Sequence, residues 1–241
     1  MEDKISLIEY LDENLNKENV DLDTQYLSHF PLFEKMINQT QYNPHHCYNL
    51  WGHTLHSINA IGKERKDLRW VMLFHDAGKP YVVGQKQNKT VGLFYVSEGI
   101  PWQTFYNHAL KSVEVAKEYI EYVFPEDYDK YLYLIKNHDI FMNFRLKEET
   151  SDKKYTWINK KNLEDILDKS IKEYPLNIED TKQLFLDLVT VSKADALAQA
   201  DIVKIPVIKD NKQDFNELTI IDTKEERIKR LDEIEKVIES F

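Results

Sequence analysis

The 241-residue chain has little of several residue types, and each shortage excludes a class of protein. Its one cysteine, Cys47, excludes an internal disulfide. Only six glycines and seven prolines occur, which favours helices over a turn-rich β fold. No run of eighteen apolar residues is present, and the first residues lack the apolar segment of a signal peptide. We therefore expect a cytoplasmic, helical protein with no membrane partner.

Positive charge is also scarce. The chain has 32 Lys and Arg residues against 42 Asp and Glu residues, a net charge of −10. Binding to a nucleic-acid duplex depends on basic residues that neutralise phosphates, so we expect no extended duplex as a partner. No glycine-rich phosphate-binding loop occurs either. A small anionic substrate that meets a local cation remains compatible with this composition.

The most informative feature present is the doublet His75-Asp76, which follows the apolar run Trp70–Phe74. Such a run is expected to be buried and to carry the doublet inward with it. An imidazole and a carboxylate in a buried position are costly unless something pairs with them, and a metal ion is a common partner of a His/Asp cluster. The doublet therefore predicts a metal site.

Histidine and aspartate recur at intervals in segments that read as helix, at His53, His108, His138 and Asp195. Helical spacing places Asp195 on an apolar stripe with Leu184, Leu188, Val191 and Ala198. Asp187 and Asp201 fall on other faces, which are more polar. His138 likewise shares a stripe with Tyr131, Leu134 and Ile135. The apolar stripes predict that Asp195 and His138 point inward.

Periodicity and breaks in the sequence predict the following helices: 3–16, 22–40, 48–63, 67–77, 104–122, 127–140, 160–173, 178–202 and 223–239. Residues 81–95 have a different character. Two apolar stretches, 81–83 and 91–95, flank Asn88-Lys89, which is compatible with a short β-hairpin. The predicted fold class is accordingly all-α, with at most this one hairpin.

The order His53, His75-Asp76, Asp195 resembles the H…HD…D signature of the HD superfamily of metal-dependent phosphohydrolases, over roughly residues 40 to 200. In that pattern the first histidine precedes Thr-Leu, which selects His53 over His56. Residues 43–49 and 52–56 look like the HD domains attached to some CCA-adding tRNA nucleotidyltransferases, although no nucleotidyltransferase segment is recognised here.

The resemblance implies a single domain over residues 1–241, built as an HD-domain helical bundle. Its HD core would cover about 40–203, with an N-terminal helical extension over 1–40. A C-terminal extension over 204–241 would end in a helix. Residues 105–108 are similar to the Tyr-Gly-His stretch of the family, with Asn107 where glycine is common.

The resemblance also implies a ligand set. His53, His75, Asp76 and Asp195 would hold one ion, and the addition of His108 and His138 would allow two, with Asp76 as the natural bridge. Imidazole and carboxylate ligands together suit Mn, Ni, Co, Fe or Zn better than Mg. A water activated by the metal would then attack phosphorus and hydrolyse a phosphate ester.

Two cations are candidates for holding the phosphate. Lys79, three residues after the doublet, would be a compact counter-charge, although it could equally complement the dipole at a helix C-terminus. Arg145 lies near the helix of His138 and is a second candidate, with a solvated surface position as its alternative.

Three functions from different classes follow. The first is a metal-dependent phosphohydrolase with catalytic Asp76 and Lys79, acting on a nucleotide, a cyclic nucleotide or another small phosphoester. The second is a di-iron oxygenase of the HD type that uses the same six ligands. The third is a non-catalytic module that binds a nucleotide or RNA. The sequence leaves the substrate, the metal and the oligomeric state open.

Overall fold

The computed structural model describes residues 2–88, 93–97, 99–147, 149, 154–172, 178–209 and 212–241. Helices dominate this part of the chain, as the sequence predicts. The α-helices are α1 (Glu2–Leu15), α2 (Thr24–Leu27), α3 (Pro31–Asn38), α4 (Leu50–Asn59), α5 (Lys66–Phe74), α6 (His108–Val123), α7 (Tyr128–Asn137), α8 (Lys160–Ile171), α9 (Ile178–Leu197) and α10 (Lys224–Glu239). Two 3₁₀-helices, η1 (Lys63–Arg65) and η2 (Lys79–Tyr81), lie on either side of α5.

The strands form two-stranded sheets only, within the described ranges. They are β1 (Val83–Gln85), β2 (Gln87–Asn88), β3 (Leu93–Phe94), β4 (Val96–Ser97), β5 (Ile100–Pro101), β6 (Gln103–Phe105), β7 (Phe144–Arg145), β8 (Thr156–Trp157), β9 (Ile202–Lys209) and β10 (Lys212–Thr223). The pairs are β1–β6, β2–β3, β4–β5, β7–β8 and β9–β10, of which only β7–β8 is parallel.

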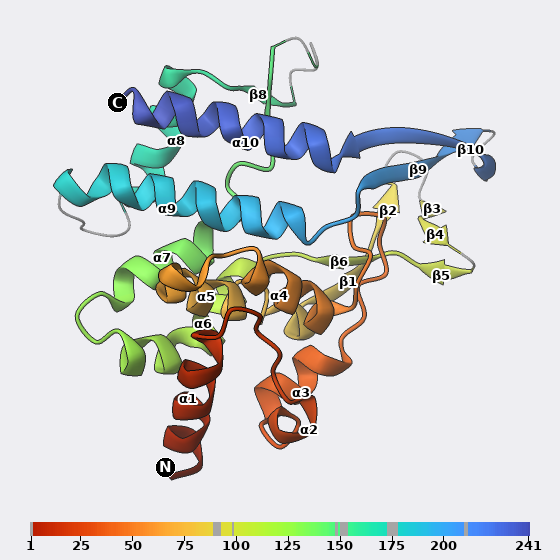
Figure 1. The fold of residues 1–241 in the computed structure, drawn as a ribbon. Helices are drawn as coiled ribbons and strands as arrows, with labels where there is room; N and C mark the ends of the chain where they lie inside the picture. The colour runs from red at the N-terminus through yellow and green to blue at the C-terminus, as the bar shows by residue number, and fades with distance from the viewer. Residues whose placement is uncertain are drawn as a thin grey trace.

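The helices are stacked in layers (Figure 1). α9 packs along α10 on one side of the molecule, and α4 and α5 lie beneath α9. α6 and α7 pack against each other, and both contact α5, whereas α1 and α3 cover the side away from α10. A continuous cluster of buried apolar side chains extends from Leu7 in α1 to Ile238 in α10. No helix within the described residues is long and apolar enough to cross a membrane.

The prediction of one continuous helix over 22–40 is wrong, because the structure has two helices there, α2 and α3. Phe30 has an extended backbone, with φ −104° and ψ 120°, and Pro31 opens α3. Proline disfavours helical geometry in the residue before it and has no N–H to donate. The apolar face of α3 still points inward, since Leu32, Phe33 and Met36 are buried.

A hairpin does occur within residues 81–95, but with fewer residues than the sequence predicts. Gln87 pairs with Phe94 and Asn88 with Leu93. Of the predicted turn Asn88-Lys89, Asn88 belongs to β2, and Lys89 lies with residues 90–92 outside the described residues. Val83 does not join this hairpin, because it pairs with Phe105 of β6. The helix predicted over 104–122 correspondingly begins later, at His108.

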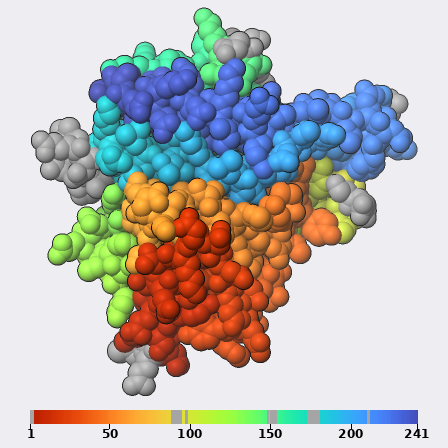
Figure 2. Space-filling model, in the orientation of Figure 1, coloured from red at the N-terminus to blue at the C-terminus, as the bar shows by residue number. Residues whose placement is uncertain are grey.

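The long hairpin of β9 and β10 is absent from the predicted elements. The helix predicted over 178–202 ends at Leu197, and the chain becomes a strand at Ile202. Ile202 pairs with Thr223 at the base of the hairpin and Lys209 with Lys212 near its tip. Pro206 is tolerated in β9 because each strand of a two-stranded sheet has a free edge. The hairpin extends from the helical body as an arm (Figure 2).

Candidate metal centre

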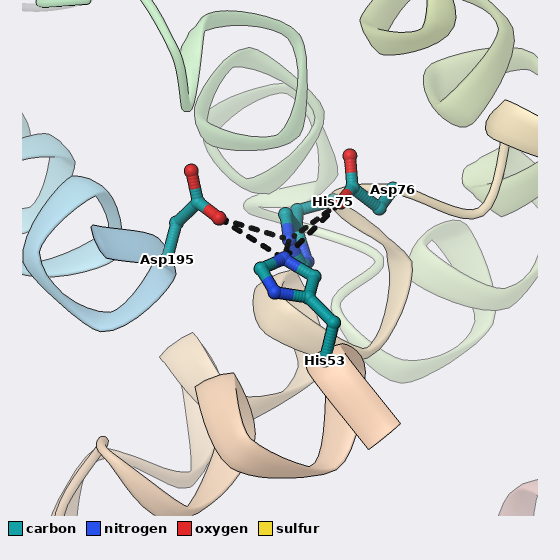
Figure 3. A group of neighbouring side chains, drawn as sticks. All are labelled: His53, His75, Asp76 and Asp195. Atoms are coloured by element: carbon teal, nitrogen blue, oxygen red, sulfur yellow. Dashed lines mark hydrogen bonds and ion pairs between the residues drawn. The ribbon is translucent and has the colours of Figure 1, made fainter. Parts of the chain in front are cut away.

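Four side chains that the sequence singled out lie together between α4, α5 and α9 (Figure 3). His53 projects from α4, His75 and Asp76 directly follow α5, and Asp195 belongs to α9. Nε2 of His53 lies 3.0 Å from Oδ1 of Asp195, 3.3 Å from Oδ2 of Asp76 and 3.1 Å from Nε2 of His75. Only Asp195 has appreciable exposure, with 15% of its side chain accessible.

A second group shares Asp76 with the first and adds His108 and His138. Oδ1 of Asp76 lies 3.2 Å from Nε2 of His108 and 3.7 Å from Nε2 of His138. The two Nε2 atoms are 3.2 Å apart. Asp76 therefore directs Oδ2 to the first group and Oδ1 to the second, which is the position that a bridging carboxylate would occupy.

Local backbone structure fixes the orientation of three of the imidazoles in the same way. Nδ1 of His75 lies 2.7 Å from the carbonyl of Met72, and Nδ1 of His138 lies 2.8 Å from the carbonyl of Ile135. His108 repeats the arrangement with a carbonyl three residues earlier, at 2.9 Å. A carbonyl can only accept, so Nδ1 carries the proton and Nε2 presents a lone pair to the centre. Such anchoring is the usual arrangement around histidines that ligate a metal.

The residues fit a cation because carboxylate oxygens and imidazole nitrogens converge, and one buried oxygen has no donor. Oδ1 of Asp76 is buried and accepts no hydrogen bond from the described residues, although Nε2 of His108 lies 3.2 Å away. A buried carboxylate oxygen that faces unprotonated nitrogens is destabilising on its own. A divalent ion would satisfy these atoms, and the mixture of nitrogen and oxygen donors suits a transition metal. The two groups are consistent with one or two ions.

The electrostatics of the centre are dominated by the two carboxylates and their burial. Burial alone would raise the pKa of Asp76, but the Lys79 ammonium and the imidazole of His75 hold it well below the usual value. Burial opposes charge on His53 as well, yet its hydrogen bonds to Asp195 and Asp76 raise its pKa to about 9. A proton on His53 thus takes the place of a cation between the two carboxylates.

Lys79 lies where the sequence led us to expect a cation beside the doublet. It is 4% exposed, and its Nζ lies 2.5 Å from Oδ2 of Asp76. Nζ also donates to Oε1 of Gln41 at 2.7 Å. The turn before it is held close to α6, because the N–H of Gly78 donates to Oγ of Ser112, and a Cβ on Gly78 would lie 2.3 Å from the carbonyl of His108.

Arg145 is not brought into the cluster. Its Nη1 donates to the carbonyls of Met142 and Phe144, each at 2.8 Å. Its guanidinium lies over the ring of Tyr155, 4.2 Å from the centroid. Burial and the nearby Arg230 lower its pKa. These contacts give Arg145 a local structural role.

Two features near the site differ from the sequence interpretation. Asp187 is only 1% exposed, because Arg65 and Lys130 cover its carboxylate. The polar face of α9 that carries Asp187 is therefore buried against these two residues. His46, which the sequence did not single out, packs its ring 5.1 Å from that of His53 and places Nε2 3.4 Å from Nζ of Lys79. The only sequence signal for His46 is its position in the segment before α4.

His56, the alternative to His53, lies on the exposed side of α4. Its ring stacks on Tyr48 with a centroid distance of 4.1 Å. The one-turn offset between the two histidines is therefore enough to separate a buried position from an exposed one.

The fold and the site together define a helical domain with a buried His/Asp cluster typical of a metal centre. Residues 45–200 match the HD domain family, which is more than half of the chain. The chain belongs to the HD domain family. Neither the curated proteins nor the solved structures gave a match. The similarity to the HD domains of CCA-adding enzymes therefore rests on the residues around His53, and no comparison supports it.

Proposed function

We propose that the chain is a metal-dependent phosphohydrolase that hydrolyses a small phosphoester, with nucleotides as the favoured substrate class. The observation that carries the proposal is the sharing of Asp76 between two groups of buried ligand atoms. Asp76 lies between all four histidines, and the adjacent Lys79 adds positive charge where an anionic substrate would bind. The membership of the HD domain family is in accord with this chemistry.

In this proposal His53, His75, Asp76 and Asp195 hold one divalent ion, and Asp76, His108 and His138 hold the other. When bound, such ions polarise phosphoryl oxygens and lower the pKa of a nucleophilic water. Asp195 and His108, with side-chain exposures of 15% and 16%, are the most accessible members and define the side from which substrate enters. Lys79 positions the bridging carboxylate and contributes charge that favours a phosphate.

The test is hydrolysis of bis-p-nitrophenyl phosphate and p-nitrophenyl phosphate by metal-stripped protein, after addition of Mn, Ni, Co, Fe, Zn or Mg in turn. We expect turnover with at least one transition metal and less with Mg. Asp76→Ala should abolish it, because both groups lose a ligand. His56→Gln is the matched control, since His56 lies one turn from His53 but is exposed, and it should retain full activity.

Three outcomes would contradict the proposal. Metal binding without turnover of either ester, together with oxygen uptake by the iron-loaded protein, would favour a di-iron oxygenase. Metal binding with neither activity would favour a binding module. Equal turnover by Asp76→Ala and wild type would show that the observed hydrolysis arises elsewhere.

A further inference from the structure

A cavity of about 320 Å³ lies next to the candidate metal centre. Its wall is formed by residues 40–44 and 46–49, between α3 and α4, together with Trp102. The volume is at the small end of the range for pockets that bind organic ligands. A group of the size of a single nucleoside fits this range, whereas a longer oligomer does not.

Two polar atoms of the cavity wall lack a partner among the described residues. They are Nε2 of Gln41 and Nδ1 of His46, and both atoms are buried. Gln41 itself is only 5% exposed. Buried polar groups are satisfied in the great majority of native structures. A ligand in the cavity that reached these atoms would satisfy them.

Lys79 determines the hydrogen-bonding character of both atoms. Its ammonium can only donate, and it faces Oε1 of Gln41 at 2.7 Å and Nε2 of His46 at 3.4 Å. Those two atoms therefore act as acceptors, so the free Nε2 of Gln41 and the free Nδ1 of His46 are N–H donors. Because Nε2 of His46 accepts from Lys79, the ring carries its single proton on Nδ1. The ligand must bring acceptors.

Aromatic side chains supply the rest of the recognition surface. Trp102 is 6% exposed and contributes to the wall, with one face stacked on Tyr95 at a centroid distance of 5.0 Å. Tyr42 and Tyr48 are exposed at the rim, and one face of Tyr48 is covered by His56. Aromatic surfaces of this kind stack on planar heterocycles with little dependence on sequence or substituent. A neutral imidazole, an amide and aromatic rings favour a flat, uncharged ring with acceptor edges over a bare anion.

The cavity and the metal centre share a wall. Lys79 contacts Gln41 on one side and Asp76 on the other, at 2.7 Å and 2.5 Å. The ring of His46 packs edge-on against His53. We infer that this cavity binds the heterocyclic base of a nucleotide, with Gln41 and His46 donating to its carbonyl or ring nitrogens. Hydrolysis of the bound nucleotide rests on the proposed function. Binding of the base in the cavity does not depend on it.

The test is calorimetric titration of chelator-treated protein with guanosine, uridine, cytidine and adenosine. The nucleosides carry no phosphate, so their binding does not depend on the metal centre. We expect at least one base with a carbonyl acceptor to bind, and to bind more tightly than adenosine.

Gln41→Glu preserves the acceptor for Lys79 but removes the donor. It should weaken nucleoside binding about tenfold, the effect of one hydrogen bond. Trp102→Leu is the second variant, and it should weaken binding at least as much.

His29→Gln, an exposed change in the turn between α2 and α3, is the control and should leave binding unchanged. The inference is overturned if no nucleoside binds, if adenosine binds best, or if both cavity variants bind like wild type. Inorganic phosphate that binds wild type but not Gln41→Glu would also overturn it. If no nucleoside binds, the result of the bis-p-nitrophenyl phosphate assay still stands, and only the base-binding inference is rejected. If nucleosides bind but no ester is hydrolysed, only the proposed function is rejected.

Discussion

At the scale of single residues, Asp76 is a buried carboxylate whose charge must be compensated by its neighbours. It is 2% exposed, and each of its oxygens faces a different pair of imidazoles. Lys79 offsets one negative charge, and a proton on His53 offsets part of the rest. Lys79 and a proton on His53 thus offset the same carboxylate charge that a divalent ion would offset.

Metal binding should therefore release a proton from His53. The pKa of His53 is about 9, and a metal requires the neutral imidazole. Below pH 9 the metal competes with this proton, so affinity should rise about tenfold per pH unit and level off near pH 9. Calorimetry with Mn or Ni at several pH values, in buffers of different ionisation enthalpy, measures both effects. An affinity that does not change with pH would contradict the assignment.

At the scale of elements, the candidate ligands occupy helix ends. His75 directly follows α5, His138 directly follows α7, and His108 opens α6. The backbone before His108 has the unusual conformation in this region: Asn107 has φ 60°, which is left-handed. Asparagine and glycine tolerate this conformation better than other residues. Asn107 therefore supplies the left-handed residue that this turn requires.

Replacement of Asn107 tests this explanation. Asn107→Val should lower the free energy of unfolding by about 2 kcal/mol, because a β-branched residue is strained at positive φ. It should also reduce the metal bound by the group that contains His108. Asn107→Gly should remain within about 1 kcal/mol of wild type. Urea unfolding and metal analysis provide the measurements, and equal stability of the two variants would contradict the role of the left-handed conformation.

The element α5 is tied to the N-terminal helix through a buried arginine. Arg69 is 2% exposed, and its Nη1 donates to the carbonyls of Leu15 and Lys17 at 2.9 and 2.6 Å. Its Nε donates to the carbonyl of Ile61 at 2.9 Å. The side chain thus satisfies carbonyls at the end of α1 and in the segment before α5, which positions the helix that carries the doublet.

Arg69→Met should destabilise the protein by about 3 kcal/mol, because it leaves several buried carbonyls without donors. Lys63→Met is the control: Lys63 forms an ion pair with Glu18 near the same segment, but both are exposed, so no measurable change is expected. Urea denaturation of the two variants measures the difference. Similar midpoints for both would show that the contacts of Arg69 do not support α1.

At the scale of the whole molecule, the site links parts of the chain that are far apart in sequence. α4, the end of α5, the start of α6, the end of α7 and the C-terminal half of α9 all contribute to it. A ligand that binds only the folded arrangement stabilises all of these elements together. The stability of the helical body should therefore depend on metal.

Addition of the preferred metal at a hundredfold excess over its Kd should stabilise the fold by about 2.7 kcal/mol. The Tm should rise by several degrees and fall again on chelation. Asp76→Asn should show no such rise, because the shared ligand is weakened for both groups. Differential scanning fluorimetry measures the shift. An equal shift in wild type and Asp76→Asn would place the stabilising metal elsewhere.

The sequence by itself determined which residues would point inward. His75 and Asp76 stand at the end of an apolar run, His138 and Asp195 stand on apolar stripes, and the pattern along a helix is a local property. His53 was preferred over His56 by the resemblance to the HD superfamily and not by periodicity. Most helices follow from the same periodicity. Periodicity failed where a single residue or a distant partner determines the secondary structure. Pro31 divides one predicted helix into two. β9 is a strand because β10 pairs with it.

Only the tertiary structure decided which atoms meet. The division of Asp76 between two groups, the contact of Lys79 with Gln41, and the cavity beside His46 depend on how helices separated in sequence pack together. The burial of Asp187 against Arg65 and Lys130 was decided in the same way. Periodicity fixes the face of a helix on which a side chain lies, whereas the neighbour of that face is set by packing over the whole core.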